Sequence, residues 1–125
     1  MLFGFENETA ALTPLEEKAA ETIARCLQAH IGVKQAITGE KIGMAMALHD
    51  AAYRDAKGRP SLTGARLRKI VNHIRVKRMC KNLIANSKGY YVSNDPQEIR
   101  DYVRGLRLRA QAIGAVADSY ECVSY

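Results

Sequence analysis

The chain has 125 residues, of which 47% are hydrophobic and 26% are charged, and 19 Lys and Arg against 13 Asp and Glu give a formal net charge of +6. This length is typical of one domain, and the share of apolar residues is enough for a core, which argues against wholesale disorder. No run approaches the roughly 20 apolar residues that a membrane span requires. The first residues lack the basic stretch and apolar run of a secretory signal, so we expect a cytoplasmic protein with no membrane partner.

The first predicted helix has clear start and stop signals. Thr13, Pro14 and Glu16 mark its start, because Thr favours the N-cap, Pro the first helical position and Glu the third. Gly32 is a stop signal, so we predict a helix over residues 14–31. Its apolar stripe repeats every four residues: Leu15, Ala19, Ile23, Leu27 and Ile31.

The middle of the chain predicts two further helices with a long connection between them. Residues 36–37 are long enough only for a stub of strand, and Thr38 follows as the N-cap of the second helix. Residues 49–60 are polar and contain Gly and Pro, which predicts a mobile connection. Thr63 then caps a third helix over residues 64–77, whose inward positions are Leu67, Ile70, Val71 and Ile74.

The C-terminal part predicts a β-hairpin followed by a long helix. Residues 83–92 form two short β-rich runs around a turn that contains Gly89. Asp95, followed by Pro, starts the last helix, over residues 96–120. Apolar residues recur along it in alternating steps of four and three, as in a coiled coil. We call these residues the seam: Ile99, Val103, Leu106, Ala110, Ile113, Ala117 and Tyr120.

The order of these elements predicts the fold class. It is mainly α with a small β-hairpin, arranged as a winged helix-turn-helix: three helices, a wing and a long C-terminal helix. We expect residues 1–12 to form an N-terminal arm and residues 13–125 to form one winged-helix domain.

Positive charge is concentrated in the centre of the chain. The stretch between Asp55 and Asp95 contains ten Lys and Arg and no acidic residue, and the rest of the chain carries 9 basic against 13 acidic residues. Such an asymmetry indicates a polyanionic partner, with nucleic acid as the first candidate. The alternative is an ordinary solvated basic face.

The third predicted helix and the hairpin turn carry the candidate site residues. Arg and Lys bind guanine or phosphate, and Asn binds adenine, so their presence on the side opposite Leu67 favours DNA recognition. The outward, flanking and terminal positions of the helix are Arg66, Arg68, Lys69, Asn72, His73, Arg75 and Lys77. The turn adds Asn86, Ser87 and Lys88, which suit phosphate contact, although a surface hairpin with a solubilising Lys is the alternative.

Two runs of sequence carry a resemblance to a known family. Residues 67–75 (LRKIVNHIR) and residues 83–92 (LIANSKGYYV), followed by a capped helix, resemble winged-helix proteins of phages and prophages. The hairpin contains the shared pattern (L/I)-I-A-x-S-x-G-Y-Y, and the resemblance covers about residues 34–117. The chain departs from the usual short helix-turn-helix connection at residues 49–60. The resemblance implies a recognition role for Arg66, Lys69, Asn72 and His73, with Asn86, Ser87 and Lys88 in the wing.

Two functions follow as hypotheses. The first is a duplex-DNA-binding protein, a transcriptional regulator or a replication accessory, that reads DNA with helix 64–77 and wing 83–92. The second is a winged-helix adaptor that docks an acidic protein, because a fold does not determine a function. The seam favours a homodimer through helices 14–31 and 96–120, and packing of the last helix onto the first within one chain is the alternative.

The sequence offers no motif for catalysis, a cofactor or a metal. The basic centre lacks carboxylates, and neither G-x-x-x-x-G-K nor G-x-G-x-x-G occurs, so we expect no enzyme activity and no cofactor. Cys26, Cys80 and Cys122 are odd in number and form no C-x-x-C pair, which predicts free thiols rather than a disulfide framework or a zinc site.

Overall fold

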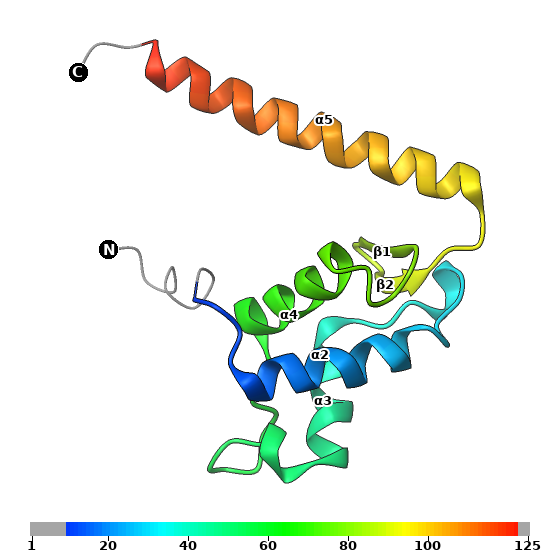
Figure 1. Cartoon of the computed structure of the whole chain (residues 1–125), viewed down its shortest axis with the longest axis vertical. Coiled ribbons are helices and arrows are strands. Elements are labelled where there is room, and N and C mark those ends of the chain that lie inside the picture. The colour runs from blue at the N-terminus through cyan, green and yellow to red at the C-terminus, as the bar shows by residue number, and fades with distance from the viewer. Residues whose placement is uncertain (1–9, 123–125) are drawn as a thin grey trace. The chain divides into compact units, whose positions relative to one another are not determined.

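The computed structural model describes residues 10–122, and this part of the chain is mainly helical with a small two-stranded antiparallel hairpin (Figure 1). It divides into two compact units, with the boundary between Asn94 and Asp95. Residues 1–9 of the predicted arm lie outside the described residues. The elements in chain order are α2 (Pro14–Leu27), the 3-10 turn η1 (Val33–Gln35), α3 (Gly39–His49), the 3-10 turn η2 (Ala51–Tyr53), α4 (Gly64–Val76), β1 (Leu83–Asn86), β2 (Gly89–Val92) and α5 (Pro96–Glu121).

The predicted positions of the helix starts are confirmed, but Thr63 at the start of α4 makes no side-chain capping bond. At the start of α2 the Thr13 hydroxyl accepts a hydrogen bond from the Glu16 N–H (3.1 Å), and the Glu16 carboxylate accepts one from the Thr13 N–H (2.9 Å). Thr38 caps α3 and Asp95 caps α5 through bonds of the same kind. These local signals succeed because a cap involves only residues within three positions of each other.

The predicted end of the first helix is wrong. α2 ends at Leu27 rather than residue 31, and both Leu15 and Ile31 are exposed although the stripe predicts them to be buried. Gly32 instead lies beyond the helix with φ of +84°, and its N–H donates to the Val92 carbonyl (2.9 Å). The helix ends early because backbone hydrogen bonds to β2 replace helical hydrogen bonds in this segment.

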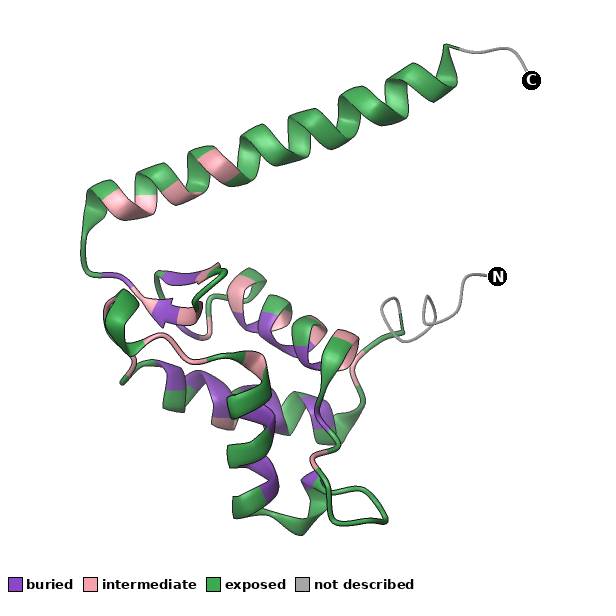
Figure 2. Ribbon diagram, turned by 180° about the vertical axis from the view of Figure 1, so that it is seen from behind, coloured by how far each residue is buried: buried purple, intermediate pink, exposed green. Residues whose placement is uncertain are grey.

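The hydrophobic core lies within the first unit, where α2 and α4 pack together and α3 packs against α4. Figure 2 shows the buried positions on the facing sides of these helices. The inward positions predicted for the third helix are all confirmed as buried. The largest fully buried apolar side chains are Ile23, Leu27, Ile70, Val71 and Ile74.

The hairpin is confirmed, and the predicted stub of strand holds it against the helices. In the antiparallel pair β1–β2, Ile84 lies opposite Tyr91, and both side chains are buried. Ile37 exchanges two backbone hydrogen bonds with Tyr90, at 3.0 and 2.8 Å. The segment just before α3 therefore anchors the hairpin next to α3 and α4.

The connection over residues 49–60 has more structure than the mobile segment that the sequence predicts. It contains η2, whose Tyr53 is buried in the core, and a bridge between Arg54 and Pro60. The Arg54 Nε–H also donates to the Ala47 carbonyl (2.6 Å). These contacts tie the polar connection to α3.

The second unit contains α5, the 26-residue helix that follows Asp95. Its predicted start and length are confirmed, but none of its residues is buried, and Figure 2 shows it only in the colours of exposed and half-buried residues. None of the helices within residues 10–122 combines the length and the apolar character needed to cross a membrane.

Candidate nucleic-acid interface

The polar side of α4 carries most of the predicted site residues. Because its four inward side chains face the core, the intervening positions remain at the surface. Arg68, Asn72 and Lys77 are exposed, whereas Lys69 is half-buried. His73 and Arg75 are half-buried as well. The outward positions inferred from helical periodicity thus lie on the solvent side, with different degrees of access.

Arg66 has an intramolecular role that the sequence pattern does not reveal. Its Nε–H donates to the Glu16 carboxylate (2.8 Å), and its NH2 group also contacts Glu16. Its Nη1 group donates to the Ala10 carbonyl (3.0 Å), and its Nη2 group also donates to the Ala11 carbonyl (3.1 Å). The guanidinium therefore ties α4 to the start of α2. It does not project freely outward as the periodicity predicts.

The Glu16–Arg66 pair is electrostatically strong. Hydrogen bonds from Arg66 lower the pKa of the Glu16 carboxyl from 4.5 to about 2, against the opposing effect of burial. The same contact raises the pKa of Arg66. Both side chains are largely covered, and Glu16 also completes the α2 capping box. This pair therefore stabilises the packing of α2 against α4.

The hairpin turn presents three of the predicted residues to solvent. Asn86, Ser87 and Lys88 are exposed, and the Lys88 N–H donates to the Asn86 side chain (2.8 Å), which shapes the turn. Gly89 follows with φ of +121°, and a Cβ there would lie 2.5 Å from the Ile37 carbonyl oxygen. Glycine at this position therefore allows the turn to lie close to the start of α3.

A hollow of about 300 Å³ lies where the starts of α3 and α4 meet β2. Arg68 from α4 contributes to it, together with a carboxylate, Glu40. Thr63 makes no side-chain capping bond, so the first N–H groups of α4 are not satisfied by that side chain. The hollow is not among the predicted sites, although a Thr-Gly pair at the start of both α3 and α4 is a local signal for it. Its lining residues are Gly39, Glu40, Thr63, Gly64, Leu67, Arg68 and Tyr90.

Three other site residues of α4 line a different hollow of about 370 Å³ near the start of α2. Lys69, Asn72 and His73 contribute to it, and Glu17 adds an acidic side chain. The structure thus splits the predicted set. Arg68 lies toward the hairpin side of α4, whereas Lys69 and His73 lie toward α2.

Within residues 10–122, no group of three or more His, Cys, Asp or Glu side chains is arranged to hold a metal ion. All three cysteines fall in this range and are free, with Cys80 buried and its pKa raised by burial.

Comparison of the chain with models of protein families, with curated proteins and with solved structures finds no match.

Proposed function

We propose that this chain binds duplex DNA with α4 and the β1–β2 hairpin, in the manner of a winged helix-turn-helix. The order of α2, the Ile37 bridge, α3, α4 and the hairpin supports this arrangement. The observation that carries the proposal is the charge of the surface segment. The stretch between Asp55 and Asp95 contains ten basic residues and no acidic residue. Five of the ten lie within α4 and the hairpin: Arg66, Arg68, Lys69, Arg75 and Lys88.

The exposed groups of α4 and of the hairpin turn suit different parts of the DNA. Arg68 and Asn72 are exposed on α4 and have donors that fit base edges in the major groove. Lys88 and the small polar residues of the turn suit the phosphate backbone. Arg66 is not part of this proposed interface, because its guanidinium is engaged with Glu16 and two carbonyls.

Binding of a labelled random-sequence duplex, followed by fluorescence anisotropy over a series of salt concentrations, tests the proposal. We expect steep salt dependence, because neutralised phosphates release counterions. Lys88→Ala, at a phosphate contact, should lower affinity about tenfold and reduce the salt slope by about one. Arg68→Ala, at a base contact, should lower affinity about tenfold with a smaller change in the salt slope. Arg25→Ala is the matched control, because Arg25 is exposed on α2 outside the acid-free stretch.

Two results would contradict the proposal. One is no binding to duplex even at low salt, which would favour an adaptor that docks an acidic protein. The other is an equal loss of affinity in Arg25→Ala and Arg68→Ala, which would indicate a diffuse attraction to the whole chain rather than an interface on α4.

A further inference from the structure

Six of the seven seam residues of α5 are exposed to solvent, and Ile99 is half-buried. Ile113 and Tyr120 are 71% and 64% exposed, and no residue of the helix is buried. The seam extends over 22 residues, or roughly 33 Å of helix. An apolar stripe of this length with a coiled-coil spacing is typical of a helix that pairs with another helix.

The composition of α5 also indicates that the helix needs a partner. Gly105 and Gly114 lie in its interior, where glycine disfavours a helix, and a Cβ at either position would meet nothing within 4 Å. Among residues 10–122, no close neighbour thus requires glycine at these two positions. Helices in proteins derive most of their stability from packing of an apolar face against another element. Contacts within α5 itself do not provide such packing.

The charges of α5 differ between its two halves. Residues 96–109 contain four Arg against two acidic residues, a net of +2, whereas residues 110–121 contain two acidic residues and no Lys or Arg, a net of −2. Arg100 and Glu121 each follow a seam residue directly, so they lie on the same flank of the seam. A parallel pair would bring the two Arg-rich halves together, whereas an antiparallel pair brings each Arg-rich half beside an acidic half.

We propose that α5 pairs antiparallel with α5 of a second copy of this chain. In this register Ala110 lies opposite the partner's Ile113, and Arg100 lies beside the partner's Glu121. The small Ala side chains of the seam allow close approach of the two helices. The proposal rests on α5 alone and is independent of DNA binding.

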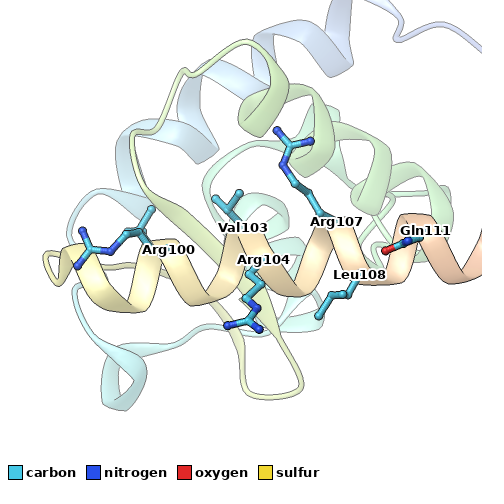
Figure 3. Close-up of a pocket in the computed structure, with 7 residues that line it drawn as sticks. Arg100, Val103, Arg104, Arg107, Leu108 and Gln111 are labelled. Carbon is cyan, nitrogen blue, oxygen red and sulfur yellow. The ribbon is translucent and has the colours of Figure 1, made fainter.

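The mass of the full-length chain in solution tests the pairing. Light scattering over a wide range of concentrations should show the mass of two chains, and Ile113→Asp should give the mass of one. Leu108→Asp is the matched control, because Leu108 is 56% exposed and points away from Val103 of the seam (Figure 3). A single-chain mass of the unaltered protein at every concentration would overturn the proposal, as would equal sensitivity to both substitutions.

Charge reversal tests the antiparallel direction without altering the apolar seam. Arg100→Glu and Glu121→Arg should each weaken the pair about tenfold, because each change creates two like-charge contacts per dimer. The double variant should restore the affinity of the unaltered chain. Both side chains are exposed, so neither change threatens folding. Additive weakening in the double variant would contradict the antiparallel register.

Discussion

The Glu16–Arg66 pair makes stability depend on pH. Because the folded protein holds the pKa of Glu16 at about 2, against an ordinary value of 4.5, the pair contributes fully above pH 4.5 and its contribution is lost as pH falls toward 2. The shift corresponds to at most about 3 kcal/mol. Glu16→Gln should therefore lower the free energy of unfolding at pH 7 by about 1–3 kcal/mol, as measured with denaturant.

A neighbouring residue provides the control for this experiment. Glu17 also lies in the first turn of α2 but is exposed, so Glu17→Gln should have little effect. The difference in the free energy of unfolding between Glu16→Gln and the unaltered chain should narrow as pH falls from 4.5 to 2. A gap that stays constant over this range would show that the charge of Glu16 is not what stabilises the packing.

Arg78 occupies a backbone conformation that suits glycine. It follows α4 with φ of +57°, and the next N–H, that of Met79, donates to the Ile74 carbonyl (3.0 Å) to close the helix end. A side chain in this left-handed region costs about 1–2 kcal/mol. Arg78→Gly should therefore raise the free energy of unfolding by about 1 kcal/mol. Lys77 has a φ of −82°, so Lys77→Gly should not raise the free energy of unfolding. Thermal unfolding of the two variants distinguishes these outcomes.

At the scale of elements, the contact of Gly89 with Ile37 attaches the hairpin to the helices. A Cβ at position 89 would clash with the Ile37 backbone and would adopt an unfavourable φ. Gly89→Ala should lower the free energy of unfolding by about 2–4 kcal/mol. Gly58→Ala separates the two causes, because Gly58 also has a positive φ but has open space around it. Denaturant unfolding should show a much smaller loss for Gly58→Ala, and equal losses would exclude the clash as the cause.

Local signals predicted the elements well, and contacts between distant segments account for what they missed. The caps at Thr13, Thr38 and Asp95 and the inward positions of α4 all follow from spacings of a few residues. The partner of Arg66, by contrast, lies 50 positions away. The order of the 49–60 connection likewise depends on burial of Tyr53 in the core, which no local pattern encodes.

The same distinction applies to the candidate site. Periodicity places the polar residues of α4 outward, because the helix repeat and the apolar stripe determine which side is buried. It does not separate Arg68, which lines the hollow beside β2, from Lys69, which lines the hollow beside α2. That separation depends on where α2, α3 and the hairpin pack around α4.

At the scale of the whole molecule, the division after Asn94 predicts that the first unit folds alone. All buried apolar residues in the described part of the chain precede this boundary, and α5 contributes none. A chain that ends at Asn94 should therefore unfold cooperatively, with a Tm within a few degrees of that of the full chain, as measured by circular dichroism.

The same shortened chain links the two proposals made for this protein. It retains α4 and the hairpin, so its affinity for a single DNA site should persist, whereas it lacks the seam and should have the mass of one chain. A folded, single-chain fragment that binds duplex DNA with an unchanged salt slope would place DNA binding and self-association in separate units. A fragment that fails to fold would show that α5 stabilises the first unit, and the two units would then not be independent.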